Sequence, residues 1–127
     1  MIIRRSLSFG LLAALLMAVP APAAERPASG DRSKAREQLD FGVKVARKGL
    51  WNEAAFRFEK AVALDPSYAA AYNDLAIAYE RDGQLDKAKA AYDKALELAP
   101  KNLQIKQNYD YFKEIHDRAK GKAAGPG

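Results

Sequence analysis

The sequence predicts an all-α fold made of a repeated helical hairpin, because landmark residues recur at one fixed interval and short turn signals separate amphipathic segments. Gly49 and Gly83 are 34 residues apart, and no insertion or deletion separates the two copies. The first copy continues with Ala54, Phe58, Ala61 and Pro66, and the second with Ala88, Tyr92, Ala95 and Pro100. A period of about this length is typical of stacked helical hairpins.

Five helices are expected, because apolar residues recur at i, i+3 and i+4 within five segments. The expected ranges are 33–47, 51–64, 68–81, 85–98 and 102–119. Gly49 and Gly83 permit the tight turn inside each hairpin, and Pro66 and Pro100 mark the breaks between helices. Residues 24–32 are expected to be a flexible linker, and residues 121–127 a disordered tail rich in glycine and proline.

Each hairpin is expected to bury one stripe from each helix. The first copy would pack Phe41, Gly42 and Val45 against Leu50, Ala54, Phe58, Ala61 and Leu64. The second copy would pack Tyr72, Leu75, Ala76 and Tyr79 against Leu85, Ala88, Tyr92, Ala95 and Leu98. Small residues in both sets indicate a close helix crossing.

The last helix, 102–119, is expected to close the array. Ile105, Tyr109 and Phe112 continue the inward stripe, whereas Asp110 stands where the earlier copies have Gly42 and Ala76. A carboxylate at that position indicates a capping helix whose outer face meets water.

The N-terminus has the pattern of an export signal, residues 1–23. Arg4 and Arg5 precede an uncharged run from Ser6 to Val19, and Ala21-Pro22-Ala23 follows it. We expect cleavage after Ala23 and a periplasmic or secreted product. An uncleaved anchor is the less favoured alternative, because the run is shorter than the roughly 20 residues that span a bilayer. No integral membrane segment is expected after signal removal.

Composition argues against several classes of function. The chain has no cysteine and one histidine, His116, without a second ligand at i+4, so we expect neither a metal site nor a cofactor. No catalytic constellation is present, so an enzyme is not expected. The net charge of +5 is mild and acidic residues are interspersed, which does not indicate nucleic-acid binding. Trp51 is interpreted as interhelical packing.

The two copies resemble the tetratricopeptide repeat family. The second carries the family's residues Tyr72, Leu75, Ala76, Tyr79, Ala88, Tyr92 and Pro100. The first matches at Phe41-Gly42, Ala54, Phe58, Ala61 and Pro66, but has Gln38 in place of an aromatic and Val45 in place of a tyrosine. The resemblance implies a short right-handed α-solenoid over residues 33–120, with repeats at about 35–68 and 69–102 and a capping helix at about 102–119.

In that family the first helices of successive repeats line a concave groove that holds a partner segment. By resemblance the groove here contains Arg36, Leu39, Val43, Arg47, Asn73, Ile77, Arg81, Tyr111 and Ile115. Val43, Ile77 and Tyr111 are spaced 34 apart and form an apolar ladder beside arginines. This favours a protein or peptide partner that is apolar and acidic. The alternative, that the ladder only pads contacts between neighbouring first helices, stays open.

The family's clamp for a C-terminal carboxylate is not expected. Leu39, Val43, Asp74, Gln104 and Asn108 occupy the matching positions and supply none of its cations.

The sequence therefore favours a non-enzymatic protein–protein interaction module of the bacterial periplasm or cell envelope. Two alternatives remain, a homo-oligomeric scaffold that completes the short array with a second copy, and an accessory subunit of an envelope enzyme complex.

Overall fold

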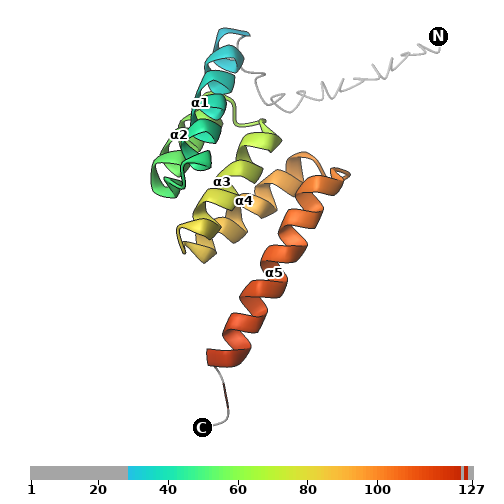
Figure 1. Ribbon diagram of the computed structural model, residues 1–127. Helices are drawn as coiled ribbons and strands as arrows, with labels where there is room; N and C mark the ends of the chain where they lie inside the picture. Colours follow the sequence, from blue (N-terminus) through green and yellow to red (C-terminus); the bar gives the residue numbers. More distant parts are fainter. Residues whose placement is uncertain (1–28, 124, 126–127) are drawn as a thin grey trace, which may run out of the picture.

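The computed structural model describes residues 29–123 and residue 125, and these form five α-helices without a strand. The helices are α1 (Ser29–Arg47), α2 (Trp51–Leu64), α3 (Ala69–Arg81), α4 (Leu85–Leu98) and α5 (Leu103–Ala123). Figure 1 shows two antiparallel hairpins, α1–α2 and α3–α4, stacked side by side, with α5 against the second. The expected all-α solenoid is confirmed.

The turns inside the two hairpins have the same geometry. Gly49 and Gly83 both have φ of 77°, a left-handed conformation that glycine adopts without strain. After each glycine a backbone N–H reaches back five residues, from Leu50 to the Val45 carbonyl at 3.3 Å and from Gln84 to the Tyr79 carbonyl at 2.8 Å. This bond satisfies a carbonyl at the helix end, so the fixed turn sets the antiparallel direction of both hairpins.

The two outer helices extend further than the sequence predicts. α1 begins at Ser29, so residues 29–32 of the expected linker are helical, and α5 continues to Ala123 into the expected tail. After Pro27 no proline interrupts α1, and Asp31 in its first turn complements the helix dipole. Lys120 and Lys122 do the same at the end of α5. The expected export signal lies outside the described residues, as do linker residues 24–28.

The core lies between the paired helices and follows the small-residue pattern. Ala54, Phe58 and Ala61 are buried in the first hairpin, as are Ala88, Tyr92 and Ala95 in the second. At Gly42 an added Cβ would lie 2.5 Å from Cε1 of the Phe58 ring, so only a hydrogen fits at this crossing. The expected close approach of the helices is therefore present.

Two residues assigned to the inward stripe instead lie at the surface. Phe41 is 44% exposed and Leu50 is also exposed. For Phe41 the reason is its position in the array, because α1 has no helix before it among the described residues. Leu50 lies in the turn between α1 and α2, as the N-cap of α2. Leu75, at the position corresponding to Phe41 in the second repeat, is only 5% exposed because α2 packs against α3.

Tyrosine–carboxylate hydrogen bonds join the successive helices α2 to α5. The phenol of Tyr79 in α3 donates to Glu59 in α2 at 2.5 Å, and the phenol of Tyr109 in α5 donates to Asp93 in α4 at 2.6 Å. Glu59 and Asp93 are 34 residues apart. Tyr92 in α4 donates to Glu80 in α3 at 3.0 Å. Each repeat is thus anchored to its neighbour by a bond to an ionised acceptor, a stronger class than neutral pairs.

An aromatic cluster holds α5 against the second hairpin. The ring of Tyr92 lies 5.2 Å from that of Tyr109 and 5.4 Å from that of Phe112, measured between centroids. Tyr92 and Phe112 are almost fully buried. The capping interpretation of the last helix is consistent with this one-sided packing, because Asp110 on its other side is exposed and pairs with Lys113 at 3.1 Å.

Replacing Gly42 with alanine should destabilise the protein. The new methyl group would displace the buried Phe58 ring, and overpacking of this kind costs about 1–3 kcal/mol. Chemical denaturation followed by circular dichroism measures the loss. Gly30→Ala is the matched control in the same helix, because nothing lies within 4 Å of its Cβ position. An equal effect of the two substitutions would contradict the close crossing.

Candidate partner-binding groove

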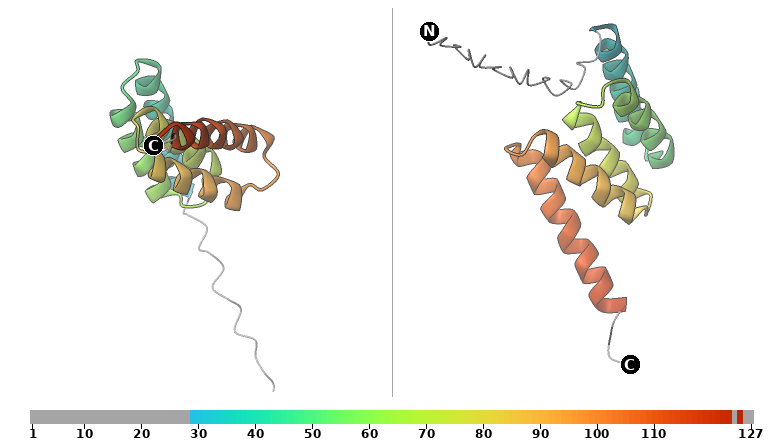
Figure 2. Two further views of the ribbon diagram at one scale, coloured as in Figure 1. Left: turned by 90° about the horizontal axis from the view of Figure 1, so that it is seen from below. Right: turned by 180° about the vertical axis from the view of Figure 1, so that it is seen from behind.

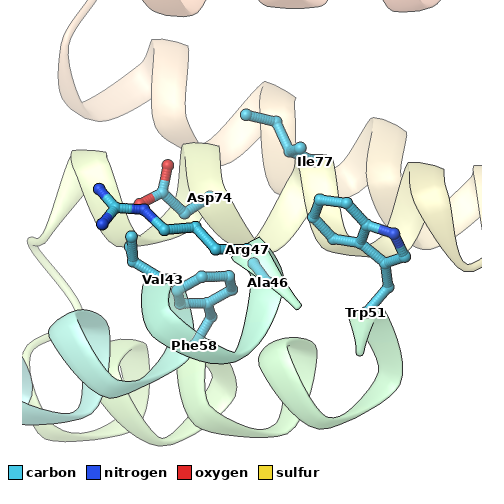
Figure 3. A pocket seen from close by; sticks show the side chains of 7 residues that line it. All are labelled: Val43, Ala46, Arg47, Trp51, Phe58, Asp74 and Ile77. Atoms are coloured by element: carbon cyan, nitrogen blue, oxygen red, sulfur yellow. The ribbon is translucent and has the colours of Figure 1, made fainter. Parts of the chain in front are cut away.

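An apolar pocket opens between α1 and α3, with α2 beneath it. It has a volume of about 220 Å³. Its lining residues are Val43, Ala46 and Arg47 from α1, Trp51 and Phe58 from α2, and Asp74 and Ile77 from α3. Figure 3 shows Trp51 and Ile77 at one end, and Val43 with the heads of Arg47 and Asp74 at the other. The pocket therefore has an apolar end and a charged end.

Helical spacing places these side chains together. Val43, Ala46 and Arg47 are at i, i+3 and i+4 of α1, and Asp74 and Ile77 are at i and i+3 of α3. Val43 and Ile77 are half-buried and pack against the core, which leaves part of each open to the pocket. The 34-residue repeat thus brings two corresponding positions to facing walls of one cavity.

Trp51 completes the apolar end. It is the first residue of α2, directly after the turn at Gly49, and it is half-buried against the core. The guanidinium of Arg81 lies 5.5 Å from the centre of its ring, within cation–π range. The indole therefore packs between helices, as the sequence predicts, and also forms one wall of the pocket.

Asp74 brings an electrostatic constraint to the charged end. Burial raises the pKa of its carboxyl above the ordinary value of 3.8, and a hydrogen bond from the Asn73 amide, 3.3 Å long, partly offsets that effect. The carbonyl oxygen of Asn73 accepts a bond from the Asn108 amide in α5 at 3.0 Å. A chain of polar groups therefore links the pocket to the capping helix.

The structure brings together some of the predicted groove residues and separates others. Val43, Arg47 and Ile77 line the pocket, and Arg81 lies against Trp51 at its edge. Arg36 lies elsewhere, in a polar depression with Asp65 and Ser67. Tyr111 and Ile115 are 68% and 60% exposed on α5, outside the pocket, and Tyr111 lines a separate depression with Gln107, Asp110 and Glu114.

Two predicted groove residues are not surface groups. Leu39 is 9% exposed and belongs to the core cluster. Asn73 is 6% exposed, and its amide group is engaged by Asp74 and Asn108. The resemblance placed both residues in the groove. For Leu39 this prediction was wrong, and for Asn73 it missed a structural role between α3 and α5.

Sequence reasoning missed the contributions of Trp51, Ala46 and Asp74 to the pocket. Trp51 carried a signal, since a lone tryptophan at the first turn of α2 can reach across to the next repeat. Asp74 is adjacent to a predicted groove residue. The sequence carried no signal for Ala46, because its contribution to the pocket lining depends only on its small side chain.

The part of the chain that the structure describes contains no group of three or more side chains suited to hold a metal ion. His116 instead stacks on Phe112, with 5.5 Å between the ring centres. Within the same residues no helix is both long and apolar enough to cross a bilayer.

Comparison with known proteins agrees with the repeat geometry. Residues 45–107 match the family model described as tetratricopeptide repeat. This segment therefore resembles the tetratricopeptide repeat family. The structure is similar to the TPR domain of OM64 from Arabidopsis, with a TM-score of 0.66 and 21% identity over 72% of this chain and 75% of that one. The structure is also similar to the Sgt2 TPR domain from Aspergillus fumigatus, with a TM-score of 0.64 and 24% identity over 73% of this chain and 62% of that one. At these identities the likeness shows the fold alone.

Curated relatives match only over part of their length. The chain is 31% identical over 94 residues to the Arabidopsis thaliana tetratricopeptide repeat domain-containing protein PYG7, chloroplastic. This match covers 74% of this chain and 31% of that protein. The chain is also 33% identical over 63 residues to the mouse protein O-mannosyl-transferase TMTC4, and this match covers 50% of this chain and 8% of that protein. The chain thus spans about a third of the first relative and less than a tenth of the second.

Asp74→Asn should stabilise the protein at neutral pH. Because the folded-state pKa of Asp74 is raised, ionisation costs folding free energy, and that cost is present at pH 7 and disappears below about pH 3, where the carboxyl is protonated in both states. The asparagine can still accept the bond from Asn73. Urea denaturation of both proteins across this pH range measures the difference. A variant that is less stable at pH 7 would show that the charge is favourable.

Proposed function

We propose that this protein is a non-enzymatic interaction module that holds a segment of a partner protein across the groove of its repeats. The apolar pocket between α1 and α3 is the observation that carries the proposal. Tetratricopeptide repeats serve generally as protein–protein interaction modules, which supports the same function. Val43, Trp51 and Ile77 would receive an apolar side chain of the partner.

The charges at the rim favour an acidic partner segment. Arg47 lines the pocket and Arg81 lies beside Trp51, both exposed and neither in an ion pair among the described residues. An arginine next to an apolar anchor is a common composition of binding surfaces. The Asp74 carboxylate inside the pocket would repel a partner carboxylate there, so an acidic group is expected over the rim and an apolar group within.

The groove is short, which limits affinity. Standard interfaces bury about 800 Å² on each partner, and three first helices offer less. We therefore expect dissociation constants no better than about micromolar for a single copy, and tighter binding only where several copies act together.

Reversing the charge of Arg47 tests the groove directly. Arg47→Glu should weaken capture of partners from an envelope fraction at least tenfold, because it places a negative charge beside the pocket that repels the acidic partner segment. Val43→Asp with Ile77→Asp should abolish capture by making the walls polar. Circular dichroism must show unchanged helix content, because Val43 and Ile77 also pack against the core.

Arg36→Glu is the matched control. It makes the same change on an exposed arginine of the same helix, away from the pocket. Equal loss with Arg36→Glu would indicate general attraction to a basic surface, and unchanged capture by both Arg47→Glu and the double variant would rule out the groove.

We propose further that the module works in the periplasm or cell envelope after removal of residues 1–23. The basic start, the uncharged run and the Ala21-Pro22-Ala23 site support export. In the producing cell, N-terminal sequencing of the protein from the envelope fraction should begin at Ala24. A protein that keeps Met1 and stays in the cytoplasm would contradict export without affecting the groove.

A homo-oligomeric scaffold is the second candidate. The specific observation in its favour is the exposed apolar set Leu103, Tyr111 and Ile115 on α5. A second copy that covered this face would bury these side chains. A mass that rises with concentration in sedimentation, without any ligand, distinguishes this candidate from partner capture.

A further inference from the structure

The N-terminal end of the array carries an aromatic and cationic cluster that the groove does not use. Its members are Phe41 of α1 and Phe56, Arg57 and Lys60 of α2. The guanidinium carbon of Arg57 lies 4.2 Å from the ring centre of Phe41 and 5.7 Å from that of Phe56. The ammonium of Lys60 lies 4.6 Å from the Phe56 ring centre. Phe41 and Phe56 both remain nearly half exposed despite these cations.

The second repeat shows what covers this position inside the array. Leu75 corresponds to Phe41, and it is buried because α2 of the preceding hairpin packs against α3. Ahead of α1 the described residues supply no such helix. The internal symmetry of the chain thus identifies the shape that fits over Phe41, which is an α-helix lying as α2 lies on α3.

The composition of this end is not that of a water-facing cap. Phe56 and Arg57 correspond to Ala90 and Ala91 in the second repeat, so the first repeat has gained an exposed ring where the second has a methyl group. The last helix, α5, differs at the position that corresponds to Ala76. Asp110 replaces the buried Ala76 and pairs with Lys113, and the Lys113 ammonium lies 4.8 Å from the Tyr109 ring centre.

The charge of the cluster selects the partner. Arg57 makes one long hydrogen bond, from Nη1 to Gln38 at 3.5 Å, and its buried Nε finds no acceptor among the described residues. No salt bridge engages Arg57 or Lys60 in the described part of the chain. Two cations outside any salt bridge of the described residues, beside two half-exposed aromatic rings, favour a ligand with both carboxylates and apolar side chains.

We propose that the N-terminal end of this array is a second docking surface, which accepts an acidic amphipathic α-helix of a partner protein in the place of a preceding hairpin. An apolar side chain of that helix covers Phe41 and Phe56, and its carboxylates face Arg57 and Lys60. The surface lies on α1 and α2 and shares no residue with the groove pocket, so it does not depend on the function proposed above.

Two synthetic peptides test the proposal by fluorescence anisotropy with the full chain. The first has the sequence of residues 51–64, the helix that covers Leu75 within the array. The second is the same peptide with its own Arg57 and Lys60 replaced by glutamate, which makes it acidic. We expect the acidic peptide to bind at least tenfold more tightly at low salt, with a ratio that shrinks as salt increases. No saturable binding of either peptide, or no preference for the acidic one, would overturn the proposal.

Matched protein variants locate the site. Phe56→Ala with Arg57→Ala introduces the residues that the second repeat already carries, so the fold should tolerate the change, and peptide affinity should fall at least tenfold. Arg47→Ala removes one arginine at the pocket between α1 and α3 and should leave affinity unchanged. Loss only with Arg47→Ala would place the peptide in the groove, which refutes the end surface and leaves the proposed function standing.

Sedimentation of the chain without peptide decides between a partner and a second copy. The proposal expects no association through this end. Self-association that the Phe56→Ala, Arg57→Ala variant removes would make a second copy the occupant and would overturn the assignment to a partner helix.

Discussion

The close contact of two helices inside each hairpin is the constraint on which this structure depends. A single ring, Phe58 in the first hairpin and Tyr92 in the second, fills the space that small residues on the facing helix leave open. Because the contact has the same spacing in both copies, both hairpins have the same shape, and equal shapes stack at a regular step. The pocket between α1 and α3 follows from that step, since it sets Val43 opposite Ile77.

Polar bonds fix the register between helices that apolar packing alone would leave loose. The phenols of Tyr79 and Tyr109 each reach a carboxylate on the preceding second helix. For Tyr79, burial and then the Glu59 carboxylate raise the phenol pKa, so the phenol remains a donor throughout the neutral range. The Lys89 ammonium and the Tyr109 hydroxyl lower the pKa of the Asp93 carboxyl, which keeps the acceptor ionised. The repeats therefore have a specific relative position.

The repeat made most of the fold predictable from sequence, whereas the ends of the array did not follow from it. Spacing of 34 residues gave the helices, the turns at Gly49 and Gly83 and the buried alanines. The repeat pattern failed to predict the exposure of Phe41. The equivalent position in the second repeat is buried because a helix precedes it, and periodicity does not show whether a repeat has such a neighbour. The prediction failed at Leu39 because resemblance transfers a role by alignment, whereas packing within the folded protein decides whether a side chain meets solvent, and Leu39 is buried in the core. Trp51 lines the pocket because its long side chain reaches it from the first turn of α2, which the repeat position alone does not predict.

The last turns of α5 stand apart from the rest of the molecule, as Figure 1 and Figure 2 show from three directions. From Asp117 to Lys122 every side chain is exposed, and the helix there is supported by local ion pairs such as that of Arg118 with Glu114. A helix without tertiary contacts is only marginally stable in water. Unfolding of these turns therefore does not reduce the stability of the rest of the fold. This end is a suitable attachment point for a fused domain or a label.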